Sequence, residues 1–410
     1  MKLLLIHQNL PAQFKHLIQR YARDPEHQVV GICQGHAPSA GDDTLPDGVV
    51  QVYKPKREPT ADIHPYLYSL EAGVLNGQAV AARVHELDRQ GFTPDLTLVH
   101  PGWGEGLYIK DVLPDRPLIG FFEFFYRARG LDADFDPDFP VSKDDELRIR
   151  TRNALHLLSL DACDAGISST AWQRQVHPPA YHSKITVLHE GIDTRELVPN
   201  PAASFELPDG TVLHSDMEVV TFVTRSLEPY RGFHVFMRAL PAILRRRPGC
   251  RIVIVGGDDV AYGRRLPEGQ TWREKMLAEV DVDPNRVHFL GPLPWAEHVR
   301  LLQTSAVHVY LTVPFVLSWS MLEAMSAGCA VIGSDTAPVR EVLQHGRNGL
   351  LVDFFSKEQL ADAVDDLFDH PRRRQALAAA GRQTVVAQYD ARDALVRYEQ
   401  YFKRVLRESR

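Results

Sequence analysis

Short apolar runs alternate with helical segments along almost the whole chain, and this alternation constrains the fold more than any other feature. In the N-terminal half the runs typical of buried strands are residues 2–8, 29–35, 95–100, 117–125 and 165–168. A second series begins at Val219, with runs at 219–225, 250–257, 286–292, 306–312, 330–335 and 349–353. Strands that alternate with helices favour parallel sheets covered by helices. The sequence therefore predicts an α/β protein with two doubly wound, Rossmann-like sheets.

A polar, proline-rich segment from Asp193 to Asp209 separates the two series. It carries turn residues and little hydrophobic periodicity, so we predict a linker there. The chain has 410 residues, 44% of them hydrophobic, and is longer than one core usually supports. We therefore expect an N-terminal domain at 1–195 and a C-terminal domain at 196–385, with a cleft between them. The last segment, 386–410, is expected to form a helix that packs back across the boundary.

Composition excludes several classes of protein. The net charge of -7 argues against a nucleic-acid-binding protein, which needs clustered lysine and arginine to neutralise phosphates. The 4 cysteines are scattered, so free buried thiols are expected. No apolar run approaches the roughly 18 residues of a membrane span, and no signal sequence is evident. We therefore expect a soluble, cytoplasmic protein with at most a weak peripheral membrane contact through the first helix, Phe14 to Tyr21.

The stretch VPFVLSWSMLEAMSAGCAVIGSD, residues 313–335, is the most informative for function. Ser318 and Ser320 can cap a helix that Gly328 ends in the left-handed conformation, and an apolar strand then resumes. Free N–H groups at such a helix start attract a phosphate. Glu323, one turn inside the helix, could accept hydrogen bonds from two sugar hydroxyls. A structural interpretation stands beside this one, because Ser320 and Glu323 also have the Ser-x-x-Glu spacing of a capping box.

Two arginines follow the first strand of the second series. Arg225 ends that strand, and Arg231 lies beyond a short loop, just before the next helix. Guanidinium groups keep their charge and bind phosphate oxygens through paired N–H bonds, so the two side chains could converge on one diphosphate. Such a pair can replace a metal ion. For either arginine alone, a surface ion pair is the alternative.

Polar and aromatic side chains also follow the strands of the N-terminal half. Ligands of open parallel sheets bind where strands end, so His100 could donate to a sugar hydroxyl or position the reacting group. Trp103 and Glu105, in the loop after it, could stack on or hydrogen-bond a sugar. His7 and Glu123 follow two other strands at the same edge. The structural alternative is that these side chains are core groups satisfied by the protein itself.

Several common catalytic and binding motifs are missing. The loop after the first strand, HQNLPAQF, has no glycine, so the chain lacks the G-x-G-x-x-G fingerprint of a dehydrogenase. The acidic loop LDADFDPDFP at 131–140 fails the calcium-loop pattern, because Pro137 replaces the required glycine and Lys143 replaces the final glutamate. No nucleophile elbow, Walker loop or H-E-x-x-H zinc helix occurs. We therefore expect neither a metal site nor a cofactor.

Taken together, these motifs resemble the retaining glycosyltransferases of family 4, which have the GT-B fold of two facing Rossmann-like domains with an interdomain cleft. The resemblance covers most of the chain. Besides the two arginines and Glu323 in LEAMSAG, it includes IVGGDD at 254–259, FLGPLP at 289–294 and HGRNGLLV at 345–352. It implies an enzyme that transfers a hexose from a UDP- or GDP-sugar to an unidentified acceptor.

The resemblance also implies roles for individual residues, with no metal required. In that family the residues matching Arg225 and Arg231 bind the donor diphosphate, and the residue matching Glu323 holds the ribose. The residue matching His100 contacts the donor sugar, and backbone around Gly291 meets the base. Backbone donors to the phosphates come from the loop that matches Ser318, Trp319, Ser320 and Leu322.

The chain departs from the family pattern at the sugar-side loop. The family usually has a second glutamate eight residues before Glu323, where this chain has Phe315, and a glycine where it has Ser318. The usual glutamate lies near the donor sugar, so Phe315 implies a variant sugar pocket, a substitute carboxylate such as Glu123, or lost catalysis. The usual Gly-Gly pair after the first strand is also replaced, by residues 9–13.

We therefore hypothesise a metal-independent, retaining glycosyltransferase of polysaccharide or glycoconjugate biosynthesis. Two alternatives stay open. One is a nucleotide-sugar epimerase or hydrolase on the same fold. The other is a non-catalytic nucleotide-sugar-binding protein, which Phe315 would favour.

Overall fold

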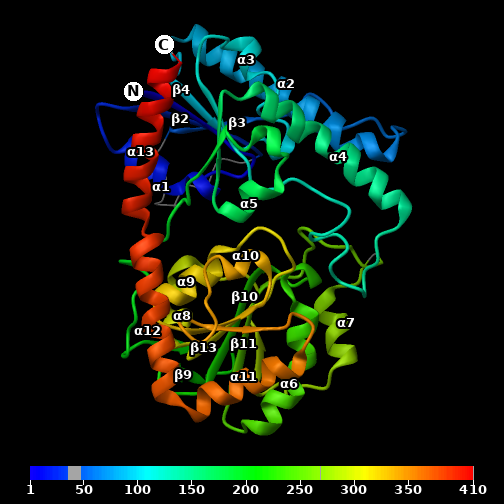
Figure 1. The fold of residues 1–410 in the computed structure, drawn as a ribbon, viewed down its shortest axis with the longest axis vertical. Coiled ribbons are helices and arrows are strands. Elements are labelled where there is room, and N and C mark those ends of the chain that lie inside the picture. The colour runs from blue at the N-terminus through cyan, green and yellow to red at the C-terminus, as the bar shows by residue number, and fades with distance from the viewer. Residues whose placement is uncertain (36–47, 268, 410) are drawn as a thin grey trace. The chain divides into compact units, whose positions relative to one another are not determined.

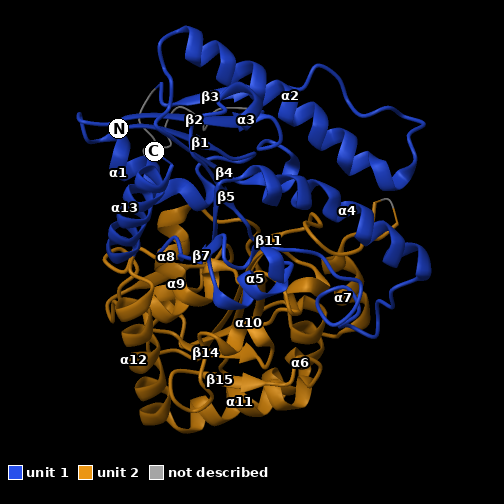
Figure 2. Ribbon diagram, turned by 45° about the horizontal axis from the view of Figure 1, so that its top comes forward, with its two compact units in different colours: residues 1–191, 391–410 blue, residues 192–390 orange. Residues whose placement is uncertain are grey.

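A computed structural model describes residues 1–35, 48–267 and 269–409, and backbone contacts divide the chain into two compact units (Figure 2). Unit 1 combines residues 1–191 with residues 391–410, and unit 2 comprises residues 192–390. The backbone thus passes between the units twice, after Gly191 and after Asp390. The sequence places the first boundary four residues later, after Arg195, and starts the terminal segment at residue 386.

Unit 1 is built on a parallel sheet of seven strands in the order β3-β2-β1-β4-β5-β6-β7 (Figure 1). The strands are β1 Lys2–Ile6, β2 Gln28–Gln34, β3 Val50–Tyr53, β4 Leu96–Val99, β5 Leu118–Phe121, β6 Ala165–Ser168 and β7 Ile185–Val187. The helices are α1 Lys15–Ala22, α2 Tyr68–Arg89, α3 Ile109–Val112, α4 Lys143–Ala162, α5 Ala171–Val176 and α13 Ala391–Glu408. The strand order reverses between β1 and β4, which is where sheets of this type bind ligands.

Apolar side chains fill both faces of the unit 1 sheet. Leu3 and Leu5 of β1 join one buried cluster, while Leu4 and Ile6 join another, because successive side chains of a strand point to opposite faces. Burial on both faces explains why such strands appear in the sequence as continuous apolar runs. Tyr398 of α13 belongs to the first cluster, so this last helix is part of the unit 1 core.

The apolar face of α1 is covered by protein. Phe14, Leu17 and Ile18 are at most 3% exposed and belong to the cluster that also contains Phe402 of α13. These apolar side chains therefore pack inside unit 1, and the weak peripheral membrane contact expected through this helix stays a prediction. Among the described residues, no helix combines the length and the apolar character needed to cross a membrane.

Unit 2 is built on a parallel sheet of six strands in the order β12-β11-β10-β13-β14-β15, beside a small antiparallel pair (Figure 1). The strands are β8 Ser204–Glu206, β9 Val212–His214, β10 Val219–Ser226, β11 Arg251–Gly257, β12 Val287–Phe289, β13 Val307–Tyr310, β14 Ala330–Ser334 and β15 Leu350–Val352. The helices are α6 Phe233–Arg246, α7 Trp272–Glu279, α8 Trp295–Thr304, α9 Trp319–Ala327, α10 Ala337–Arg340, α11 Lys357–Asp369 and α12 Pro371–Gln388. All the strands predicted for this half are confirmed.

The segment predicted as a linker, 193–209, packs into unit 2. Leu197 lies in one buried cluster of this unit, and Phe205 and Leu207 lie in another. Each of these three side chains is at most 7% exposed. The segment is therefore structural, and its proline and polar residues shape a short hairpin rather than a free connection. The expectation of buried free thiols is confirmed for all four cysteines.

Candidate functional site

A pocket of about 420 Å³ opens in unit 2 where β10 and β11 end and α9 begins. Apolar side chains of Val255, Pro292 and Leu293 line part of it, next to the carboxylate residue Asp259. Five predicted donor-binding residues also line it, namely Arg225, Ser318, Trp319, Ser320 and Glu323. The structure thus brings together side chains that are up to 98 positions apart in the sequence, at the edge where parallel sheets bind ligands.

The start of α9 forms one end of this pocket. Ser318 is the N-cap residue, and its side chain accepts a hydrogen bond from the Ser320 backbone N–H at 3.4 Å. Gly328 ends the helix at φ 92°, which confirms the predicted left-handed stop. Ser320 lies inside the helix, so the capping box between Ser320 and Glu323 is not formed. The positive end of the helix dipole at this helix start favours an anion in the pocket.

Glu323 is bound by a histidine that the sequence analysis did not single out. Oε2 of Glu323 lies 3.0 Å from Nε2 of His298 on α8, and each residue is 9% exposed. Both residues line the pocket. The signal in the sequence was weak, because His298 stands among the apolar residues of an ordinary amphipathic helix.

The two predicted arginines lie in different surroundings. Arg225 is exposed and lines the large pocket, whereas Arg231 is 8% exposed. Nη1 of Arg231 donates to the carbonyl oxygen of Val316 at 2.8 Å and to Oγ1 of Thr312 at 3.1 Å. Arg231 faces a second cavity, of about 10 Å³, which shares Ser318 with the large pocket. Of the two guanidinium groups, only that of Arg225 lines the large pocket; that of Arg231 lies behind the start of α9.

Phe315 packs into the protein at the position where a carboxylate was expected. It is 3% exposed, its ring centroid is 4.8 Å from that of Tyr262, and both rings lie 5.6 Å from the guanidinium carbon of Arg231. The neighbouring acid is Glu228, which is fully buried and accepts hydrogen bonds from the N–H groups of Tyr262 and Gly263 at 3.1 and 2.8 Å. Burial raises the pKa of Glu228. Sequence reasoning missed this carboxylate, although Glu228 lies between the two arginines in the sequence.

The predicted base-contacting loop lies beside the pocket as well. Gly291 has φ 67°, and its carbonyl oxygen accepts from the N–H of Gly256 at 3.2 Å, which ties the end of β11 to the loop after β12. The side chain of Leu322 is 1% exposed and belongs to the unit 2 core. At residue 322, therefore, only the backbone is suited to meet a ligand.

In unit 1, three predicted aromatic and histidine rings form one group. The ring of His100 lies 4.7 Å from that of His7 and 4.8 Å from that of Trp103. Nδ1 of His100 accepts from the Gly102 N–H at 3.3 Å, and Nε2 lies 3.3 Å from Oε2 of Glu123. Glu123 also accepts a hydrogen bond from Gln13. Four of the five residues proposed for this half are therefore neighbours at the carboxyl ends of β1, β4 and β5.

Glu105, the fifth residue, lies in the protein interior. Its side chain is fully buried, and the hydroxyl of Tyr53 donates to Oε1 at 2.9 Å. The glycines around it serve packing, because Gly104, at φ +94°, lies directly against the backbone of Gly73 in α2. The structure therefore presents no carboxylate at residue 105 to a sugar.

The burial of Glu105 predicts a pH effect on stability. Burial raises its pKa from 4.5 to about 7, so between these values the folded chain holds a proton that the unfolded chain has lost. The free energy of unfolding then falls by about 3 kcal/mol as the pH rises through this window. Glu105→Gln keeps an acceptor for Tyr53 without the charge, so urea unfolding at pH 5 and pH 8 should show a smaller loss than in the wild type. Glu58→Gln, at an exposed carboxylate, is the control; equal losses in Glu105→Gln and wild type would contradict the prediction.

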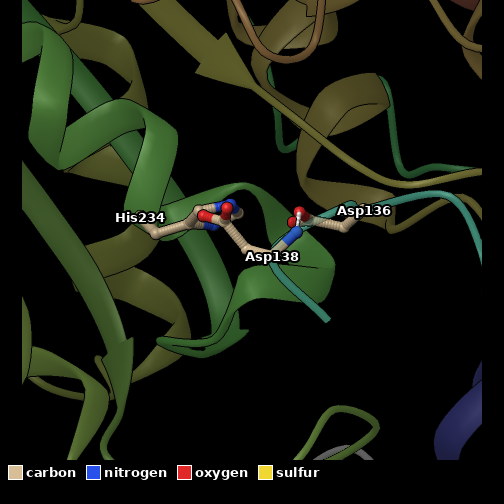
Figure 3. A group of neighbouring side chains, drawn as sticks. All are labelled: Asp136, Asp138 and His234. Carbon is tan, nitrogen blue, oxygen red and sulfur yellow. Dashed lines mark hydrogen bonds between the residues drawn. The ribbon is translucent and has the colours of Figure 1, made fainter. Parts of the chain in front are cut away.

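Two aspartates of the acidic loop at 131–140 are joined by a hydrogen bond. Within it, the N–H of Asp138 donates to Oδ1 of Asp136 at 3.0 Å. Figure 3 shows these two aspartates together with His234 of α6. The aspartates belong to unit 1 and His234 to unit 2.

Two family models match consecutive parts of this chain. Residues 25–197 match the model described as "Glycosyl transferase family 4 group", and residues 207–384 match "Glycosyl transferases group 1". A GDP-mannose-dependent alpha-(1-6)-phosphatidylinositol monomannoside mannosyltransferase of Mycobacterium tuberculosis is 33% identical over 214 residues, which cover 50% of this chain and 52% of that protein. A D-inositol 3-phosphate glycosyltransferase of Corynebacterium glutamicum is 29% identical over 203 residues, covering 48% and 46%. The chain thus spans about half the length of these curated relatives.

Solved structures share the whole fold. HepE of Anabaena, crystallised with UDP-glucose, has a TM-score of 0.68 at 17% identity and covers 98% of this chain, with 99% of its own length matched. Sucrose-phosphate synthase of Thermosynechococcus elongatus has a TM-score of 0.73 at 16% identity, with 100% of each chain covered. Two Rossmann-like units of this kind define the GT-B class of α/β proteins. With both family models matched, the chain belongs to the glycosyltransferases of the family 4 type.

Proposed function

We propose that this chain is a retaining glycosyltransferase that moves a sugar from a nucleoside-diphosphate donor to an acceptor hydroxyl without a bound metal. The observation that carries the proposal is the unit 2 pocket, where Arg225, the start of α9 and Glu323 share one cavity. A guanidinium and helix-start N–H groups favour a diphosphate. A carboxylate accepts hydrogen bonds from sugar hydroxyls. The pocket therefore suits the two polar parts of a nucleoside diphosphate.

The proposed reaction develops negative charge on the leaving phosphate. The bond between the anomeric carbon and the phosphate oxygen breaks, a bond to the acceptor oxygen forms on the same face of the sugar, and the acceptor proton passes to the leaving phosphate. Arg225, Arg231 and the α9 N–H groups stabilise this charge as it forms. Because these fixed positive groups do the work that a divalent cation would do, chelation by EDTA should leave turnover unchanged.

The relatives suggest which substrates to try first. One relative is named for GDP-mannose and a phosphatidylinositol monomannoside, and another for D-inositol 3-phosphate, whereas HepE was crystallised with UDP-glucose. We therefore propose a hexose donor carrying guanosine or uridine, with an inositol-containing acceptor as the first class to test. His7, His100 and Trp103 in unit 1 are proposed to contact the acceptor or the donor sugar.

A second candidate function is nucleotide-sugar binding without catalysis. Phe315 favours it, because this buried ring packs against Tyr262 where the family usually carries a carboxylate. Glu228 does not simply replace that group, since its Oε2 accepts from the backbone N–H groups of residues 262 and 263, and its Oε1 lies 3.3 Å from the N–H of residue 262.

Donor binding followed by product release tests the proposal. A ligand present at 100 times its dissociation constant stabilises the folded state by about 2.7 kcal/mol, so at least one of UDP, GDP, UDP-glucose and GDP-mannose should raise the melting temperature. Release of the nucleoside diphosphate from that donor should then require D-inositol 3-phosphate or phosphatidylinositol. Release without acceptor would indicate a hydrolase or epimerase, and a thermal shift without release would favour the binding protein. Glu323→Ala, as the control, should reduce the shift.

A further inference from the structure

The histidine that contacts Glu323 is held by its own surroundings. His298 and Glu323 come from different helices, α8 and α9, and their side chains are 11% and 12% exposed at the wall of the pocket. The ring of Trp295, one turn earlier on α8, packs at 5.5 Å from the imidazole ring with an interplanar angle of 33°. This ring contact and the burial of the imidazole restrict how far the ring can rotate. Its position therefore limits the orientations that Glu323 can take.

The hydrogen bond divides the two oxygens of Glu323 between protein and ligand. Nε2 of His298 holds Oε2 at 3.0 Å, which leaves Oε1 for a group that enters the pocket. A glutamate side chain has three rotatable torsions. Without this contact, the side chain would lose conformational entropy when a ligand orders it. Fixing the carboxylate before the ligand arrives removes that cost from binding.

We propose that His298 is a positioning residue that orients Glu323 toward the ribose diol of the donor nucleotide and so makes the pocket selective for ribonucleotides over 2′-deoxyribonucleotides. The proposal rests on the proposed function, because Glu323 meets ribose only if the pocket holds a nucleoside diphosphate. A hydrogen bond from a ligand hydroxyl to a charged group changes affinity by roughly 10- to 100-fold. An analogue that lacks the 2′-hydroxyl should lose about this factor.

Calorimetric titration of the whole chain with UDP, GDP, dUDP and dGDP tests the inference. The wild type should bind one ribonucleotide roughly 10-fold or more tightly than its deoxy analogue. His298→Ala should bind the ribonucleotide as weakly as the deoxynucleotide, with deoxynucleotide affinity unchanged. His298→Gln keeps an N–H donor and should restore part of the preference. The double variant His298→Ala/Glu323→Ala should be no less selective than either single variant, because the two residues act through one contact.

His288→Ala is the matched control, since His288 is another histidine of unit 2, 9% exposed on β12 and outside the pocket lining. It should keep the ribonucleotide preference of the wild type. An unchanged preference in a folded His298→Ala variant would overturn the inference while leaving the proposed function intact. A wild type that binds none of the four nucleotides would overturn the proposed function itself, and this inference with it.

Discussion

Replacing Arg231 by alanine will lower the turnover number of the proposed transfer by roughly 10- to 100-fold or more, by analogy with the loss of about 100- to 1,000-fold when one charge-stabilising donor is removed. Arg231 is buried beside the start of α9, where little water screens its charge. Its Nη1 atom also donates to the carbonyl oxygen of Val316, so the side chain stabilises the loop that leads to Ser318. Both effects act on the transition state, in which the leaving phosphate gains charge.

Initial-rate kinetics with the donor found by the thermal-shift screen would check this prediction. Arg231→Lys keeps a cation but loses the planar fork, so its turnover should lie between those of the wild type and the alanine variant. Arg225→Ala removes the exposed cation and should mainly raise the KM for the donor. Urea unfolding of each variant separates lost catalysis from lost stability. Turnover close to that of the wild type in a folded Arg231→Ala variant would refute the role of this side chain.

Replacing Gly104 by alanine will destabilise unit 1 by about 3 kcal/mol or more, because backbone strain and a backbone clash add at one position. Gly104 has φ +94°, and a Cβ there would stand 2.2 Å from the carbonyl oxygen and 2.4 Å from the Cα of Gly73. Backbone atoms inside helix α2 cannot move aside as a flexible side chain would. Relief therefore requires the loop that carries His100 and Trp103 to move away from the helix.

Gly91→Ala is the control for this prediction. Gly91 has nearly the same φ, +90°, but an added Cβ there meets nothing within 4 Å. It should cost only about 1 kcal/mol, which is the strain of a left-handed residue alone. The urea midpoints of the two variants are compared with that of the wild type. The difference between the two variants gives the cost of the clash, because both carry the strain of a left-handed residue. Equal midpoints for Gly104→Ala and Gly91→Ala would contradict the prediction, because they would show that the clash with Gly73 is relieved at little cost in stability.

Most of the fold was predictable from the sequence, and the exceptions have a common cause. Long apolar runs such as β1 and β10 were found because burial on both faces leaves a strong local signal. The strands β3, β7, β8 and β9 were missed because each has only one buried residue, so they leave no continuous apolar run in the sequence. The helical spacing of α1 was read correctly, but the packing of its apolar face was not predicted, because the covering helix, α13, lies some 370 residues later in the chain.

The candidate site shows the same division at the level of single residues. The stop of α9 at Gly328 follows from backbone preferences that act within a few residues. The hydrogen-bond partner of Glu323 does not follow from such local preferences. The sequence pattern predicted Ser320, three residues away, whereas in the structure the partner is His298, 25 residues away. Sequence reasoning also grouped the two arginines, whereas packing against Phe315 buries Arg231 and leaves Arg225 exposed.

By itself the sequence determined two parallel sheets, the loops that follow their strands, and the types of charged and polar groups available there, because apolar runs and helix caps are local properties. Only the tertiary structure decided which of those groups share a pocket, which are buried, and which partner each one binds. A polar side chain bonds with whatever folding brings within about 3 Å, and that depends on the packing of whole helices and strands.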